Sequence, residues 1–242
     1  MSTHPSGIVS GPIRGDWRQW YHDRWSDVAG AVCFAGLAAW TLTRMPEVGV
    51  FLLPTLTHEL FVAIAFLLRD RPKAVHSAPA ARAVAYGGTF LILGFFHAAR
   101  TWWPGWLAQG GVPQIAVLGA ILWLAGSLLV IFSVWSLRYA FSIEPEARRV
   151  VRSGAYTFVR HPIYLGYVLQ YGGVWLIYPS AALGLVLLVW LGLTLARIRF
   201  EEHVLAQTFP QYDEYRRRTG ALFPRLLRPR AAAPVQKRAQ TA

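Results

Sequence analysis

The chain has 242 residues, of which 55% are hydrophobic and 15% are charged, and its formal net charge is +12. A soluble domain carries about 25% charged residues, and here the apolar residues come in runs as long as a membrane span. These values exclude a water-soluble globule and a disordered chain, and the single cysteine, Cys33, excludes a disulfide scaffold and a cysteine zinc site. In a membrane protein, excess Lys and Arg is expected on the cytoplasmic side, so the charge does not indicate a nucleic-acid partner.

The first segment, residues 1–26, is expected to lie at the membrane surface. Its apolar and aromatic residues recur at helical spacing among arginines, which is typical of a helix in the interface. These residues are Ile13, Trp17, Trp20, Tyr21 and Trp25, with Arg14, Arg18 and Arg24 among them. A poorly ordered tail with aromatic anchors is the alternative. No small-residue cleavage site follows the first apolar run, which argues against a signal peptide.

Six apolar segments follow, and we interpret each as a membrane span. They are residues 27–43, 48–68, 84–99, 112–137, 162–177 and 181–196. Four are near the short limit of about 17 residues for a span. Three residues join the last two segments, which predicts a helical hairpin. The predicted fold is all-α: a polytopic membrane helical bundle of about six spans, with residues 27–137 as its scaffold.

The basic residues predict the orientation of this bundle. All 24 lysines and arginines except Arg44 and Arg100 fall on one side of it. Cytoplasmic loops carry such an excess, so both termini are expected in the cytoplasm. The Arg- and Ala-rich composition, with no organelle signal, favours a bacterial inner membrane.

His58 and Glu59 are adjacent near the middle of the second predicted span. Ionisable residues at that depth are costly and are candidates for function. One interpretation is a neutral Glu59 that is hydrogen-bonded inside the bundle. Another is a polar relay in a transporter or scaffold, which is the non-enzymatic alternative for the chain. The two halves of a transporter often resemble each other, whereas the two halves of this sequence do not.

The fifth span begins with Arg160-His161-Pro162. A residue before proline is pushed out of the α region, and proline is favoured as the first residue of a helix. The free amides of that first turn would point to the cytoplasm and attract an anion. The pattern predicts an anion pocket at the membrane surface, without identifying the anion.

A second polar cluster, Arg197, Glu201 and Glu202, follows the sixth span. Arg197 and Glu201 are four residues apart and share a helix face. The hairpin should return this face to the level of His161. A solvated helix with internal salt bridges is the alternative interpretation.

Together the two clusters resemble the isoprenylcysteine carboxyl methyltransferase family and its relatives, the membrane phospholipid N-methyltransferases. The resemblance covers about residues 150 to 224. The matching residues are Ser153-Gly154-Ala155-Tyr156, Arg160-His161-Pro162-Ile163-Tyr164-Leu165-Gly166, Arg197, Glu201-Glu202, Phe209-Pro210 and Tyr212 to Tyr215. Residues 138–224 would then form the cofactor-binding and catalytic region, and residues 225–242 a disordered basic tail.

The resemblance implies a cytoplasmic catalytic pocket that binds S-adenosylmethionine. Carried over by position, the cofactor-binding residues would be Arg148, Arg149, Val150, Val151, Tyr156, His161, Pro162, Ile163, Tyr164 and Glu201. Arg197 would face the methyl acceptor, so Arg197 and Glu201 are the expected catalytic residues. Phe141 falls where the family has a polar cofactor contact.

The chemistry of these residues suits that cofactor. Its carboxylate fits a helix N-terminus and His161, and its ammonium fits Glu201. Tyr156 and Tyr164 can pack the adenine or face the sulfonium. The chain lacks the glycine-rich Rossmann fingerprint, and no His or carboxylate spacing predicts a metal site.

The acceptor is expected to be lipophilic and to enter from the bilayer, where membrane lipids are the surrounding partners. A carboxylate on a lipid-modified group, an amine on a phospholipid headgroup and a small thiol all fit the sequence.

Overall fold

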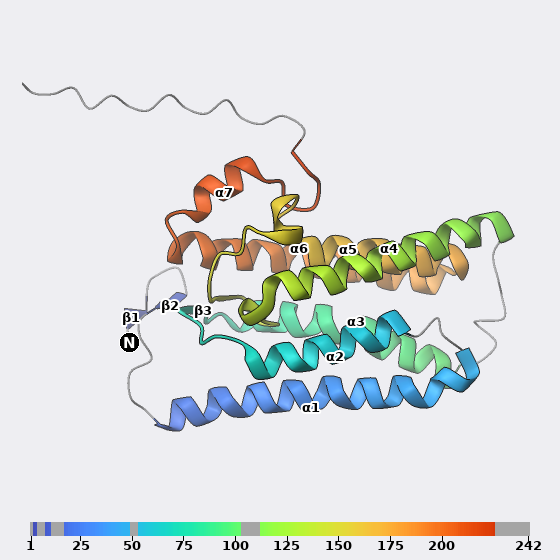
Figure 1. Cartoon of the computed structure of the whole chain (residues 1–242), viewed down its shortest axis with the longest axis horizontal. Coiled ribbons are helices and arrows are strands. Elements are labelled where there is room, and N and C mark those ends of the chain that lie inside the picture. Colours follow the sequence, from blue (N-terminus) through green and yellow to red (C-terminus); the bar gives the residue numbers. More distant parts are fainter. Residues whose placement is uncertain (1, 4–7, 11–16, 49–52, 103–111, 226–242) are drawn as a thin grey trace, which may run out of the picture.

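The computed structural model describes residues 2–3, 8–10, 17–48, 53–102 and 112–225. Within these ranges the main body is helical (Figure 1). The helices are α1 (Trp17–Val48), α2 (Leu53–Leu68), α3 (Pro79–Trp102), α4 (Pro113–Leu137), α5 (Pro162–Ile177), α6 (Ala181–Thr208) and α7 (Tyr212–Arg218). Two short 3-10 helices, η3 (Arg138–Ala140) and η4 (Gly154–Thr157), lie between α4 and α5.

The long helices lie lengthwise beside one another in three main pairs. α1 packs on α2, α3 on α6, and α4 on α5 (Figure 1). Residues 178–180 join α5 to α6, as the predicted hairpin requires, yet α5 packs most extensively on α4 rather than on α6. α7 lies beside the end of α6, outside the three main pairs (Figure 1).

Two helical stretches in the described ranges are long and apolar enough to cross a membrane. They are Gln114–Ala140, with a mean hydropathy of 2.6, and Ala181–Thr208, with a mean hydropathy of 2.1. The outer face of α4 is exposed and apolar at Val117, Ile121 and Leu128, which suits a lipid environment. α2 is apolar but shorter. The number of six spans stays a prediction.

A seam of four glycines brings α4 and α5 together. Gly119 and Gly126 are seven residues apart on α4, as are Gly166 and Gly173 on α5. A Cβ on Gly126 would lie 2.5 Å from the Gly166 carbonyl oxygen, and one on Gly119 would lie 2.6 Å from that of Gly173. Small residues let helix backbones approach closely in membranes. This seam fixes the first turn of α5, where His161 and Tyr164 stand, against α4.

A small antiparallel sheet corrects the expectation of an all-α fold. Its strands, in the order β1-β2-β3-β4, are β1 (Ser2–Thr3), β2 (Ile8–Ser10), β3 (Ala74–His76) and β4 (Glu146–Ala147). β3 pairs with β4 in the register Val75↔Glu146. Strands of two or three residues are too short to show the alternation by which a strand is recognised in sequence. The sheet ties the α2–α3 connection to the segment that precedes α5.

Several helix boundaries differ from the predicted segments, and the differences are largest at the start of α1 and the end of α6. α1 begins at Trp17 and runs without interruption past residue 26, so the predicted boundary between an interfacial segment and a first span falls inside one helix. α6 continues past residue 196 to Thr208. The helix therefore includes the polar residues that follow the apolar run. Side chains 9–24, which carry most of the predicted interfacial pattern, and the predicted tail from residue 226 lie outside the described residues.

Candidate active site

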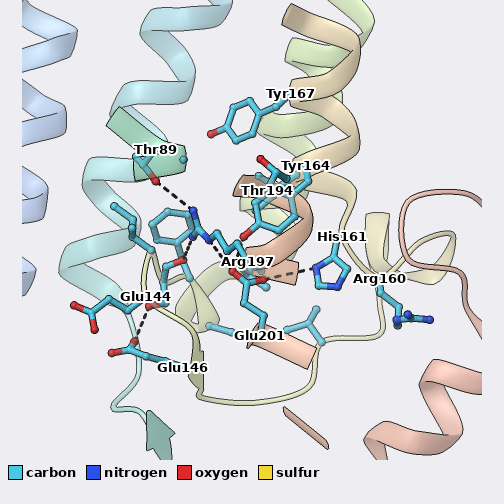
Figure 2. A pocket seen from close by; sticks show the side chains of 18 of the residues that line it. Thr89, Glu144, Glu146, Arg160, His161, Tyr164, Tyr167, Thr194, Arg197 and Glu201 are labelled. Atoms are coloured by element: carbon cyan, nitrogen blue, oxygen red, sulfur yellow. Dashed lines mark hydrogen bonds and ion pairs between the residues drawn. The ribbon is translucent and has the colours of Figure 1, made fainter. Parts of the chain in front are cut away.

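One cavity joins the inner faces of α2, α3, α5 and α6 to the segment between α4 and α5 (Figure 2). Its volume is about 180 Å³, many times the roughly 10–15 Å³ that one water requires, so it has room for a group much larger than a single water. The residues expected at the site that line it are Arg148, Arg149, Val150, Val151, Tyr156, His161, Ile163, Tyr164, Arg197 and Glu201. Pro162 is not among the residues that line this cavity: as the first residue of α5, it is fully buried, and its cofactor contact stays a prediction.

Glu201 of α6 lies at the centre of the polar end of the cavity. Its Oε1 accepts hydrogen bonds from the Tyr164 hydroxyl at 2.5 Å and from Arg197 Nε at 2.9 Å. Its Oε2 lies 3.7 Å from His161 Nδ1 (Figure 2). The carboxylate is therefore oriented by α5 on one side and by its own helix on the other.

Arg197 is buried and is held by three parts of the chain. Besides Glu201, its NH1 donates to Thr89 Oγ1 of α3 at 3.2 Å and its NH2 to the Ser142 carbonyl at 3.3 Å. Its guanidinium also lies 5.3 Å from the ring centroid of Tyr164. The sequence offered no signal for Thr89 or Ser142, because both contacts depend on how distant segments pack.

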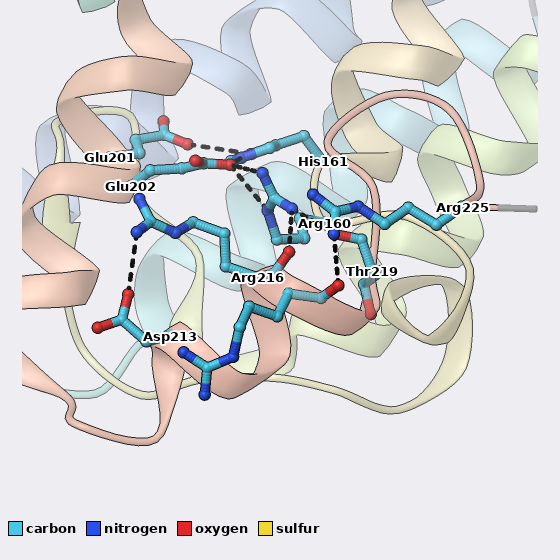
Figure 3. Close-up of polar contacts among 9 residues, drawn as sticks. Arg160, His161, Glu201, Glu202, Asp213, Arg216, Thr219 and Arg225 are labelled. Atoms are coloured by element: carbon cyan, nitrogen blue, oxygen red, sulfur yellow. Dashed lines mark hydrogen bonds and ion pairs between the residues drawn. The ribbon is translucent and has the colours of Figure 1, made fainter. Parts of the chain in front are cut away.

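The sequence predicts Arg160 beside an anion pocket, but its guanidinium binds other parts of the chain. Its Nε and NH2 donate to Glu202 Oε1 at 2.8 and 2.6 Å, and its NH1 donates to the carbonyls of Arg216 and Thr219 (Figure 3). The guanidinium therefore fastens α6 and α7 to the start of α5. It is not directed at an external anion.

His161 lies between two carboxylates. Its Nε2 is 3.1 Å from Glu202 Oε1, opposite the Glu201 contact, and its ring stacks on Tyr164 at 5.7 Å. Its backbone N–H donates to the Ala221 carbonyl at 3.0 Å. Its polar neighbours are acidic, so a bound anion would depend more on the segment around Arg148 than on this imidazole.

Arg148 lines the cavity, and its guanidinium contains a buried donor without a partner in the described part of the chain. Its NH2 donates to Glu146 Oε2 at 2.6 Å, and Ser142 Oγ donates to the same oxygen at 2.6 Å. Its Nε is buried without a hydrogen-bond partner among the described residues. Burial lowers the pKa of Arg148. A buried, unsatisfied N–H costs about 1–3 kcal/mol, and the Arg148 guanidinium brings positive charge to the cavity wall.

Tyr156 is held in the cavity wall by η4 and α7. The Tyr215 hydroxyl donates to the Tyr156 carbonyl at 2.6 Å. Gly154, at the start of η4, has φ +60°, and a Cβ there would collide with Ser136. Burial raises the pKa of Tyr156 well above its usual value and that of Tyr215 to about 12. Both phenols are therefore neutral at physiological pH.

The side chains of His58 and Glu59 lie in different surroundings. His58 lines the cavity, and its Nε2 lies 2.8 Å from the Tyr167 hydroxyl. Glu59 is buried against Thr41 of α1, and its Oε2 has no hydrogen-bond partner among the described residues. Adjacent residues on a helix face different directions, and of the two, His58 alone lines this cavity. The sequence did not place His58 at the candidate active site.

Phe141 is buried and lines the cavity, and its ring meets Phe66 edge-on at 5.5 Å. An apolar ring therefore stands where the resemblance implies a polar contact. Among the described residues, no three His, Cys, Asp or Glu side chains are grouped so as to hold a metal ion.

Comparison with known proteins shows a family match over part of the chain. Residues 115–212 match the family model described as phospholipid methyltransferase. The chain is 32% identical over 139 residues to the cobalt-zinc-cadmium resistance protein CzcN of Cupriavidus metallidurans, a match that covers 57% of this chain and 60% of the relative. It is 37% identical over 82 residues to the nickel-cobalt-cadmium resistance protein NccN of Alcaligenes xylosoxydans xylosoxydans, which covers 34% of this chain and 38% of the relative.

A third relative is an enzyme by name. The chain is 32% identical over 134 residues to protein-S-isoprenylcysteine O-methyltransferase B of Arabidopsis thaliana, a match that covers 54% of this chain and 64% of the relative. In all three cases the match spans less than two thirds of the relative's length. The resemblance inferred from the sequence is confirmed: residues 115–212 form a domain of the phospholipid methyltransferase family, with distant homology to isoprenylcysteine O-methyltransferase.

Proposed function

We propose that this chain is an integral membrane methyltransferase, which moves a methyl group from S-adenosylmethionine to a lipophilic acceptor at the membrane–cytoplasm interface. One observation carries the proposal. Within a domain of a methyltransferase family, His161, Tyr164, Arg197 and Glu201 converge on one cavity. His161 and Tyr164 lie in the middle of the family match and Arg197 and Glu201 in its C-terminal part, and helix packing brings them together.

The cavity residues fit the charges of the cofactor. The positive charge of Arg148, which lines the cavity, suits its carboxylate. Glu201 suits its ammonium, and the rings of Tyr156 and Tyr164 suit its adenine or its sulfonium. When bound, the cofactor supplies an electrophilic methyl group.

The chain's own contribution is alignment and charge placement. Arg197 and Tyr164 fix Glu201 before any ligand arrives, so little reorganisation is needed on binding. Holding two reactants in line is worth several kcal/mol of a displacement barrier. In this proposal Glu201 contacts the cofactor and Arg197 faces the acceptor.

The acceptor is proposed to reach the cavity from the bilayer of a bacterial inner membrane. The exposed apolar faces of α4 and α6 support a lipid environment. A carboxylate on a lipid-modified group, an amine on a phospholipid headgroup and a small thiol are the candidate acceptors. The relatives CzcN and NccN are named for metal resistance, and those names do not identify a methyl acceptor.

Binding of radiolabelled S-adenosylmethionine to the detergent-solubilised protein tests the proposal and separates it from a non-enzymatic transporter or scaffold. We expect saturable binding that Glu201→Gln weakens at least tenfold. Glu214→Gln is the matched control, because Glu214 is half-exposed and pairs with Arg218 in α7. Absence of saturable binding in the wild-type protein would contradict the proposal.

A further inference from the structure

The inner end of the cavity contains a polar pair that the proposed function does not use. His58 of α2 and Tyr167 of α5 approach to 2.8 Å between Nε2 and the hydroxyl oxygen, and their rings meet edge-on at 5.6 Å. Both residues line the same cavity as Arg197 and Glu201. Tyr167 is one helical turn beyond Tyr164, whose hydroxyl donates to Glu201 (Figure 2).

The surroundings of this pair are aromatic and apolar. Tyr167 stacks on Tyr171 at 5.6 Å, and Trp190 meets Tyr171 edge-on at 5.1 Å. Val62 and Leu93 complete this part of the wall. The cavity therefore changes from a charged end at Glu201 to an apolar end at His58, and the polar groups His58 and Tyr167 stand at the apolar end.

The contacts of Arg197 bear on which acceptor fits between these ends. Its guanidinium already donates to Glu201, Thr89 and the Ser142 carbonyl. A carboxylate acceptor would have to share this cation with Glu201, its partner in the buried ion pair. A neutral acceptor needs no such sharing, and the neighbouring Tyr167 hydroxyl offers it a hydrogen-bond partner.

We propose that the acceptor is a neutral protic nucleophile, a thiol or an amine, and that the Tyr167–His58 pair takes its proton; this inference rests on the proposed function. As the acceptor's sulfur or nitrogen forms its bond to the methyl carbon, the carbon–sulfur bond of the sulfonium breaks and its electron pair stays on sulfur. The acceptor's proton passes to the Tyr167 oxygen, and the Tyr167 proton passes to His58 Nε2.

The charge balance of the cavity favours this route. Methyl transfer turns the sulfonium cation into a neutral thioether, while protonation turns neutral His58 into a cation. The net charge inside the buried cavity is the same before and after the step. Burying an additional uncompensated charge would be costly, and this route avoids that cost.

Two thiols distinguish proton removal from a structural role for His58. An alkyl thiol is mostly neutral in water at neutral pH and needs a base. An aryl thiol is largely ionised there and needs none. With labelled donor and the full-length protein, we expect His58→Gln to lower kcat for the alkyl thiol by about 10²-fold, with the KM for S-adenosylmethionine unchanged. For the aryl thiol, kcat should fall less than threefold.

The controls keep the test specific. His203→Gln removes an exposed histidine of the same helix as Glu201 and should leave both rates unchanged. Free imidazole should restore part of the alkyl-thiol rate to His58→Ala.

Equal losses on the two thiols, or an undiminished alkyl-thiol rate in His58→Gln, would overturn the role of His58. Methylation of a long-chain carboxylate, with no methylation of either thiol or of a long-chain amine, would overturn the acceptor class. Failure of the wild-type protein to bind S-adenosylhomocysteine would instead contradict the proposed function.

Discussion

Arg197 and Glu201 form a buried pair within α6, with 2.9 Å between Nε and Oε1. Hydrogen bonds connect the pair to Tyr164 of α5 and to Thr89 of α3. A carboxylate and a guanidinium held in this way keep fixed positions in a cavity that also admits a ligand. This relationship links the packing of the bundle to the chemistry proposed for it.

Replacement of Arg197 by lysine tests its role in turnover. Lysine keeps the charge but loses the planar fork, so it cannot reach Glu201, Thr89 and Ser142 together. We expect near-normal binding of S-adenosylhomocysteine and a loss of about ten- to a hundredfold in turnover. Turnover is measured with the identified acceptor, and binding by calorimetry. If Arg197 only anchors the helix, Arg197→Lys would retain wild-type turnover.

The cofactor assignment predicts weaker binding in two variants. Glu201→Ala removes the partner of the cofactor's ammonium, and His161→Ala removes the ring that stacks on Tyr164 and neighbours both carboxylates. Loss of a charge-assisted hydrogen bond is worth about 1.5–3 kcal/mol, so we expect ten- to a hundredfold weaker binding of S-adenosylhomocysteine in calorimetric titrations. Wild-type affinity in both variants would remove these residues from the cofactor site.

The glycine seam predicts opposite effects for two adjacent substitutions in α5. A Cβ on Gly173 would collide with the Gly119 carbonyl and lie 2.6 Å from the Trp123 nitrogen, whereas one on Gly172 would meet nothing within 4 Å. We expect Gly173→Ala to destabilise the protein by about 1–3 kcal/mol. Gly172→Ala should be neutral or slightly stabilising, because alanine favours helix. Thermal unfolding in detergent compares the two, and equal midpoints would contradict close packing of α4 on α5.

The charge distribution predicts the topology. Lys73 lies in the basic connection between α2 and α3, and Gln109 in the connection that follows α3. With Cys33 replaced by serine, we expect a membrane-impermeant thiol reagent to label Gln109→Cys in intact cells. Lys73→Cys should react with the same reagent only after the membrane is permeabilised. The reverse pattern would show that the orientation is inverted.

The sequence allowed the helical body and much of the candidate site to be predicted, for physical reasons. Long apolar runs mark α4 and α6 directly, and the His161-Pro162 step marks the start of α5. The spacing of Arg197 and Glu201 requires that they share a helix face. These are local properties of the chain, which neighbouring residues determine.

Features that depend on packing between distant segments could not be predicted. Thr89 and Ser142 contact Arg197 only because α3 and the segment after η3 close over α6. His58 reaches Tyr167 across 109 residues of sequence, and the direction of Arg160 depends on where α7 docks. The strands of the sheet are too short to leave a pattern.

Product analysis tests the central claim most directly. The purified protein is incubated with methyl-labelled S-adenosylmethionine and a bacterial lipid extract, and the labelled products are identified by mass spectrometry. We predict a lipophilic product that has gained one methyl group, formed together with an equal amount of S-adenosylhomocysteine and lost in Glu201→Ala. Saturable cofactor binding without any labelled product, or a product formed equally by Glu201→Ala, would contradict the proposal that this cavity performs methyl transfer.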